Sequence, residues 1–432
     1  MIKRILYTLL IMFPVLASAQ INTDRVMAIG RNALYFEDYV LSIQYFNQVI
    51  NAKPYLSDPY FYRGLAKINL DDFQGAESDC SEAIERNPFV VSAYQVRGLA
   101  RIQQNNFAGA IEDYTKALEF DPENIGVWHN MALCRIRQED YKGAKNDLDK
   151  LIAISPRYTK AYLMRGEVDL KQKDTLAAEK DFGKAIEIDR YDADTWASRA
   201  ILRLQQQRYK DAEADFDHAI RLSTRNSGVY INRALARYHQ NNLRGAMSDY
   251  DIALDIDPNN FIGHYNRGLL RAQVGDDNRA IQDFNFVIEM EPDNMMAIFN
   301  RGLLLDQTGD YKGAIKDYST VINEYPNFLL GYQYRAQARR KIGDVKGADA
   351  DEFKVLKAQL DKQNGVDPNK QTADNTENNK TRKKSDKNMN NYRKIVVADN
   401  EEGEEKYKSD YRGRVQDKNV NIVPQPMFVL TY

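Results

Sequence analysis

Small and large apolar residues recur along this chain with a period of 34 residues. When repeats start at Thr23, at Ser57 and then every 34 residues as far as Leu329, position 8 is always Gly or Ala, and position 20 is Ala in all but the first. Positions 4, 24 and 28 carry mostly aromatic or large aliphatic residues. This spacing fits two amphipathic helices whose small residues allow a close antiparallel approach. The pattern therefore predicts one helix pair per repeat.

Prolines mark where the second helix of each pair should end, because proline donates no backbone hydrogen bond and disfavours a helical residue before it. Position 32 holds Pro54, Pro88, Pro122, Pro156, Pro258, Pro292 and Pro326, while Arg190 and Thr224 occupy it in two repeats. The register runs from 54 to 326 without insertion or deletion. We expect an all-α fold, an α-solenoid superhelix of about ten helix-turn-helix repeats over residues 23–362, with a degenerate first repeat at 23–56.

These columns resemble the tetratricopeptide repeat family, and the resemblance covers residues 23–362. It implies that the first helix of each pair lines a concave face that binds ligands, chiefly through positions 2, 5, 9, 12 and 13. At positions 5, 9 and 12 the apolar candidates for such a groove are Phe61, Leu65, Ile68, Leu99, Ile102, Leu133, Ile136, Ile201, Leu204, Ile231, Leu235, Tyr238, Tyr265, Leu269, Phe299 and Leu303. The alternative is that the position 9 leucines seal one first helix against the next.

A polar regularity accompanies the apolar one. In the nine repeats after the first, position 23 is always Asp and position 7 is Arg except at Met131, whereas the first repeat has Ile29 and Tyr45 there. Because these positions lie on facing helices, each guanidinium can fork onto its carboxylate. The predicted ion-pair ladder is Arg63–Asp79, Arg97–Asp113, Arg165–Asp181, Arg199–Asp215, Arg233–Asp249, Arg267–Asp283, Arg301–Asp317 and Arg335–Asp351. An anion-binding arginine row is the alternative, but the aspartates would neutralise it.

The first residues have the pattern of a secretory signal peptide. Lys3 and Arg4 precede a short apolar run, and Ala17 and Ala19 flank Ser18 as in a cleavage site. We expect residues 1–19 to be removed, leaving Gln20 first and no integral membrane span. This predicts an exported protein, most plausibly periplasmic, with secretion or outer-membrane association as alternatives.

The chain after the repeats changes composition. Residues 363–419 are predicted to be a disordered linker, since the Asn-, Lys- and Thr-rich stretch at its start has few apolar residues. Residues 420–432 are apolar and alternate like a strand, with Phe428, Leu430 and Tyr432 on one face. This last segment is expected to dock on the chain's own groove or on a partner.

Composition and motifs narrow the function. The 60 basic residues nearly cancel 62 acidic ones, which argues against a nucleic-acid partner. No two of the four histidines share a metal-ligand spacing, so we expect them at scattered surface or groove positions, and we assign no metal, cofactor or catalytic residue. The sequence predicts a non-enzymatic scaffold that binds extended segments of unidentified cell-envelope proteins. A glycan-binding accessory protein, for peptidoglycan or another polysaccharide, is the alternative.

Overall fold

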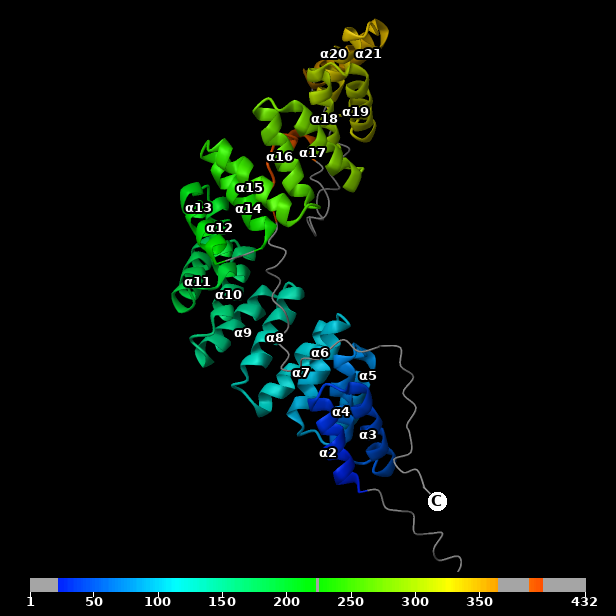
Figure 1. Ribbon diagram of the computed structural model, residues 1–432, viewed down its shortest axis with the longest axis vertical. Coiled ribbons are helices and arrows are strands. Elements are labelled where there is room, and N and C mark those ends of the chain that lie inside the picture. Colours follow the sequence, from blue (N-terminus) through cyan, green and yellow to red (C-terminus); the bar gives the residue numbers. More distant parts are fainter. Residues whose placement is uncertain (1–21, 223–224, 364–387, 399–432) are drawn as a thin grey trace, which may run out of the picture. The chain divides into compact units, whose positions relative to one another are not determined.

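The structure is a computed structural model that describes residues 22–222, 225–363 and 388–398. Within these ranges the chain forms twenty α-helices and one short 3-10 helix, and no strand (Figure 1). The prediction of an all-α fold built from consecutive helix pairs is thereby confirmed. The described residues divide into two compact units, the first ending at Ile188 and the second beginning at Asp189.

The described part of the first unit consists of five helix pairs. They are α2 (Thr23–Tyr35) with α3 (Tyr39–Ala52), α4 (Asp58–Asn69) with α5 (Phe73–Arg86), α6 (Val91–Gln103) with α7 (Phe107–Phe120), α8 (Ile125–Arg137) with α9 (Tyr141–Ile154), and α10 (Thr159–Lys171) with α11 (Thr175–Ile188).

Five further pairs form the second unit. They are α12 (Ala193–Gln205) with α13 (Tyr209–Arg221), α14 (Ser227–His239) with α15 (Leu243–Ile256), α16 (Phe261–Gln273) with α17 (Asp277–Met290), α18 (Met295–Thr308) with α19 (Tyr311–Glu324), and α20 (Leu329–Lys341) with α21 (Val345–Gln363). The 3-10 helix η2 (Met389–Asn391) also belongs to this unit.

Each turn inside a pair has the same construction. One residue adopts a positive φ, which is Asp71, Asn105 or Glu139 in three early pairs and Gly275, Gly309 or Gly343 in the last three. In most pairs an Asp or Asn then begins the second helix by accepting a backbone hydrogen bond, as Asp72 does from the Gly75 N–H at 2.9 Å. The exceptions are Arg208 before α13 and Asp276 before α17, which make no such bond. The left-handed residue reverses the chain within a few residues, so the two helices lie side by side.

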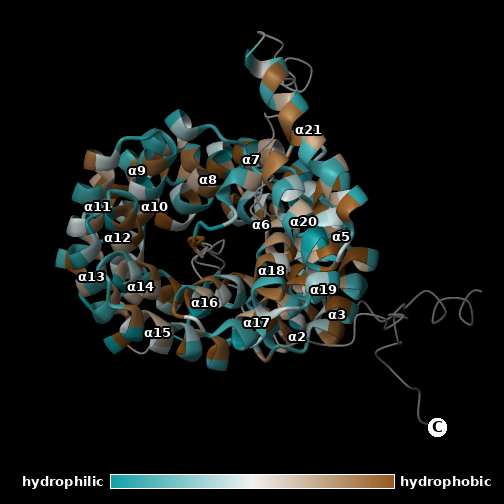
Figure 2. Ribbon diagram, turned by 90° about the horizontal axis from the view of Figure 1, so that it is seen from above, coloured by the Kyte–Doolittle hydropathy of each residue, from teal (hydrophilic) through white to brown (hydrophobic). Residues whose placement is uncertain are grey.

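Small residues decide how closely the two helices of a pair approach. A Cβ added at Gly98 in α6 would lie 2.7 Å from the ring of Tyr114 in α7. The alanines of the position 20 column are fully buried, as at Ala110. Figure 2 shows that the helices carry both hydrophobic and hydrophilic residues, as helices with one packed and one solvated side do. Within the described ranges, no helix combines the length and apolar character needed to cross a bilayer.

Candidate functional site

Three asparagines on successive first helices hold an extended segment of the same chain. Asn232 in α14, Asn266 in α16 and Asn300 in α18 share position 6 of their repeats, and all three are buried. Residues 388–398 lie against these helices, shown in red-orange beside α16 in Figure 1. The sequence register of 34 residues thus becomes a row of amide groups along one face of the second unit.

Two of these asparagines each bind one residue of the segment through both of its backbone groups, the N–H and the carbonyl. The Val396 N–H donates to Asn266 Oδ1 at 2.8 Å, and Asn266 Nδ2 donates to the Val396 carbonyl at 2.7 Å. Asn232 repeats the arrangement two residues later, with 2.9 Å from the Ala398 N–H and 3.0 Å to the Ala398 carbonyl. Such pairs satisfy each buried amide with peptide groups alone, so they recognise an extended backbone without selecting a side chain.

An aromatic residue anchors the other end of the segment. The Tyr392 ring packs edge-on against Phe299, with ring centroids 4.9 Å apart. Its carbonyl accepts hydrogen bonds from Tyr265 Oη at 2.7 Å and from Asn300 Nδ2 at 2.5 Å. Met389 is buried in the same apolar cluster. Here side-chain packing adds selectivity to the backbone contacts.

Three of the remaining side chains, those of Ile395, Val397 and Ala398, face the helices. Ile395 and Val397 pack on the cluster formed by α12, α13 and α14, and Ala398 is buried against the cluster of α14 and α15. Val396, between them, is 40% exposed. The segment runs opposite to the order of the repeats, from α18 through α16 to α14.

The docked segment corrects the predicted division of the tail. Residues 388–398 fall inside the range 363–419 that we expected to be a linker, yet they are bound because Met389, Tyr392, Ile395 and Val397 supply apolar contacts. The segment that we expected to dock, 420–432, and the expected signal peptide, 1–19, lie outside the described residues. The asparagine column at position 6 was the signal that could have located this site.

The apolar groove candidates are mostly not open to solvent. Tyr265 and Phe299 contact the docked segment. The buried candidates are Phe61, Leu65, Leu99, Ile102, Leu133, Leu204, Ile231, Leu235, Tyr265 and Phe299, and the half-buried ones are Ile68, Ile136, Ile201, Tyr238, Leu269 and Leu303. This burial argues against an apolar groove that is open to solvent. For Leu65, Leu99, Leu133 and Leu235 it agrees with the alternative in which the position 9 leucines seal one first helix against the next.

The structure brings each predicted Arg and Asp of the ladder together. The shortest nitrogen–oxygen distance in each of the eight pairs lies between 2.5 and 2.9 Å. All nine position 23 aspartates are buried. In seven pairs Nε and Nη2 each donate to one carboxylate oxygen, as Arg233 does to Asp249 at 3.0 and 2.6 Å. This forked geometry fixes the two helices of a pair relative to each other.

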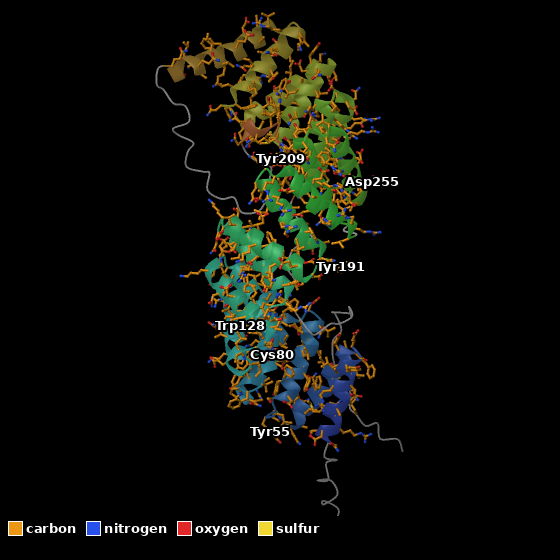
Figure 3. All side chains as sticks on the ribbon, turned by 90° about the vertical axis from the view of Figure 1, so that its left-hand side faces the viewer. Tyr55, Cys80, Trp128, Tyr191, Tyr209 and Asp255 are labelled. Atoms are coloured by element: carbon orange, nitrogen blue, oxygen red, sulfur yellow. The ribbon has the colours of Figure 1, made fainter. Side chains whose placement is uncertain are left out.

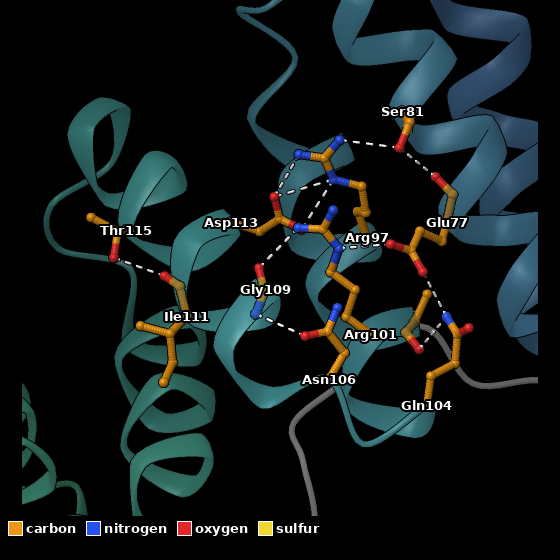
Figure 4. Close-up of polar contacts among 11 residues, drawn as sticks. Glu77, Ser81, Arg97, Arg101, Gln104, Asn106, Gly109, Ile111, Asp113 and Thr115 are labelled. Atoms are coloured by element: carbon orange, nitrogen blue, oxygen red, sulfur yellow. Dashed lines mark hydrogen bonds and ion pairs between the residues drawn. The ribbon is translucent and has the colours of Figure 1, made fainter. Parts of the chain in front are cut away.

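Two further columns complete the ladder, and the sequence analysis missed both. One turn after the arginine, position 11 supplies a second cation, such as Arg101, whose Nη1 lies 3.0 Å from Asp113 (Figure 4). The third guanidinium nitrogen of the position 7 arginine reaches position 25 of the preceding repeat, as Arg97 does to Ser81 at 3.1 Å. The i, i+4 spacing of the cations was visible in the sequence. Seven of the eight ladder arginines join two repeats in this way, whereas the corresponding position before Arg199 is Gly183.

Burial and the neighbouring cations act in opposite directions on the pKa of each buried aspartate. Burial raises the pKa values of Asp113 and Asp249 although two arginines contact each of them. Burial raises the pKa of Asp283, but the hydrogen bond from His264 and the contacts with Arg267 and Arg271 outweigh it, so this pKa lies below the ordinary value. Asp147 has Arg135 as partner but Met131 in place of the ladder arginine, and burial raises its pKa to about 6. Among these aspartates with a raised pKa, Asp147 is contacted by one arginine, whereas Asp113 and Asp249 are each contacted by two.

Two histidines and both cysteines take structural positions. His129 is buried and lies 3.2 Å from Tyr158 Oη, and His264 Nδ1 lies 2.9 Å from Asp283. For these two the expectation of scattered surface or groove histidines is corrected, whereas His218 and His239 are exposed. Cys80 (labelled in Figure 3) and Cys134 are buried free thiols whose pKa values burial raises. In the described ranges, no group of three or more His, Cys, Asp and Glu could hold a metal ion.

Comparison with known proteins gives the same repeat. Family models described as tetratricopeptide repeat match residues 125–158, 159–192, 198–261 and 265–327, and one described as TPR repeat matches 98–134. No curated protein matches the chain in sequence.

Solved structures with similar folds are distant in sequence. A tetratricopeptide repeat protein from Parabacteroides merdae is 21% identical over 58% of this chain and 98% of its own, with a TM-score of 0.46. The C-terminal part of a TPR repeat-containing protein from Cytophaga hutchinsonii is 16% identical over 54% and 95%, with a TM-score of 0.48. YrrB, a TPR protein with an unusual peptide-binding site, is 20% identical over 43% and 95%, with a TM-score of 0.36. The repeat matches and the helix pairs together show that this chain belongs to the tetratricopeptide repeat family.

Proposed function

We propose that this chain is a non-enzymatic adaptor of the cell envelope that binds an extended segment of another protein along α14, α16 and α18. Stacked helix-pair repeats provide long surfaces for such interactions. The observation that carries the proposal is the pairing of Asn266 and Asn232 with the N–H and carbonyl of one residue each. Both atoms of each side-chain amide match a peptide backbone, which favours a polypeptide ligand over the glycan alternative.

Photo-crosslinking from the groove tests this function. A photoreactive amino acid placed at Gln273, which is exposed at the end of α16, would be activated in envelope preparations containing the mature chain, and adducts would be identified by mass spectrometry. We expect adducts with a protein segment that are lost when Asn232 and Asn266 are both changed to Ala. The matched control, Asn259→Ala together with Asn241→Ala, alters asparagines of the inter-helix turns and should leave the adducts unchanged. Adducts confined to glycan, or insensitive to the Asn232/Asn266 change, would contradict the proposal.

The envelope location is proposed from residues 1–19 alone. Their charged start, apolar run and Ala-Ser-Ala end suit export and cleavage after Ala19. Intact-mass measurement of the protein recovered from its native host should give a chain that begins at Gln20. Recovery of the form that begins at Met1, in the cytoplasm, would contradict the location while leaving the groove proposal in place.

A further inference from the structure

We propose that residues 389–398 compete with an external ligand for the groove along α14, α16 and α18. This ligand is an extended segment with an aromatic residue at the place of Tyr392, which is four positions before the residue bound by Asn266 and six before the residue bound by Asn232. This inference rests on the proposed function. It adds the chemical pattern of the ligand and the reason why the free protein holds its groove occupied.

The pattern follows from what each position of the docked segment contacts. The backbone of 396 and 398 is bound by side-chain amides. Position 396 tolerates many residues because the Val396 side chain is 40% exposed, whereas the buried Ala398 side chain favours a small residue at 398. Tyr392 instead has its ring against Phe299 and its carbonyl bound by Tyr265 and Asn300. An aromatic ring at this place gains both packing and orientation. The ligand is therefore defined by one aromatic residue and an extended backbone after it.

The segment can act as a competitor because it is covalently connected to the repeats whose groove it fills. Only 24 residues, 364–387, separate the end of α21 from Asn388. A tether of that length gives the segment an effective concentration on the order of millimolar at the groove, so even a weak contact fills it. Arg393, Lys394 and Val396 stay exposed in the docked state, so the segment uses only part of its surface for binding. A partner that also contacts neighbouring helices can displace it.

The variant Val396→Pro should release the segment from the groove without damaging the fold of the repeats. Val396→Pro removes the N–H that donates a hydrogen bond to Asn266 Oδ1. Proline is compatible with an extended backbone, and the side chain that it replaces is not buried. Val396→Ala, which keeps the N–H, is the matched control. The probe is a fluorescent peptide with the sequence of residues 388–398, added to the full mature chain and followed by anisotropy.

We expect the Val396→Pro chain to bind the peptide about three- to tenfold more tightly than wild type, the factor that one lost hydrogen bond supplies, and Val396→Ala to match wild type. In the peptide itself, replacing the tyrosine that corresponds to Tyr392 by alanine should weaken binding at least about tenfold, whereas phenylalanine should preserve it. Peptide binding should disappear in a chain with both Asn232→Ala and Asn266→Ala.

Several results would overturn the inference. Equal peptide affinity of the wild-type and Val396→Pro chains would remove the competitor role. Equal affinity of the tyrosine and alanine peptides would remove the aromatic requirement. A wild-type dimer in sedimentation that dissociates in Val396→Pro would show that the segment occupies the groove of a second copy. Each of these can occur while the crosslinks to an envelope protein persist, so the competitor and the proposed function fail separately.

Discussion

The repeat formed by α8 and α9 has Met131 at the position where the other ladder repeats have arginine, so the substitution Met131→Arg would supply the missing arginine. Asp147 in α9 is buried and bound by Arg135 Nε at 2.7 Å, whereas the corresponding aspartates of most other repeats have two cations. The Thr115 hydroxyl lies 3.9 Å from Met131 Sδ, at position 25 of the preceding repeat. An arginine at this position therefore finds both of its usual acceptors, the carboxylate of Asp147 and a hydroxyl across the repeat boundary.

The size of the effect follows from the pKa of Asp147. Burial raises this pKa from 3.8 to about 6, so the folded chain binds a proton more tightly than the unfolded chain. Stability from this group is fully present below pH 4 and is lost as pH rises through 6. A difference of about two pKa units corresponds to about 3 kcal/mol. Met131→Arg should lower the pKa of Asp147 and recover about 1–3 kcal/mol of that loss at pH 7, with little effect at pH 4.

Urea denaturation followed by circular dichroism, at pH values from 4 to 7.5, measures this difference. Wild type and variant are compared at the same pH, so that the titration of other carboxylates cancels. Met131→Leu is the control, because it keeps an apolar side chain and should leave the pH profile of wild type unchanged. A stability difference between Met131→Arg and wild type that stays constant from pH 4 to 7.5 would refute the reasoning, whatever its sign.

Two other expectations concern packing and pairing. Arg233→Met should lower stability by about 1–3 kcal/mol, and adding Asp249→Leu should recover part of it, because the single change leaves a buried carboxylate short of one partner; additive losses in urea denaturation would contradict the pairing. Gly166→Ala should lower the free energy of unfolding by about 1–3 kcal/mol, since its Cβ would lie 2.5 Å from the Phe182 ring. Gly183→Ala should raise it by up to about 1 kcal/mol, because no atom lies within 4 Å of the added Cβ. Shifts of the urea midpoint in the same direction for both variants would contradict this account.

The periodic part of this protein could be predicted from its sequence because each repeat contacts only its neighbours. The small residues at positions 8 and 20 predict two helices in close contact, and Gly98 against Tyr114 shows that contact. The same local rule covers the ladder, since Arg97 and Asp113 lie on the two helices of one pair. Because the contacting residues recur at the same positions of every repeat, the sequence alone shows which residues pair.

The 34-residue period carries the asparagine side of the binding site, but not the segment that the asparagines bind. Asn266 and Val396 are 130 positions apart in the chain, and only tertiary structure brings the amide of one to the backbone of the other. Backbone recognition leaves almost no trace in side-chain identity, so residues 392–398 were included in the predicted linker. Burial of the apolar groove candidates was equally undecided in the sequence, because a leucine that seals two helices and a leucine that lines an open groove occupy the same position of the repeat; only the packing of neighbouring repeats distinguishes them.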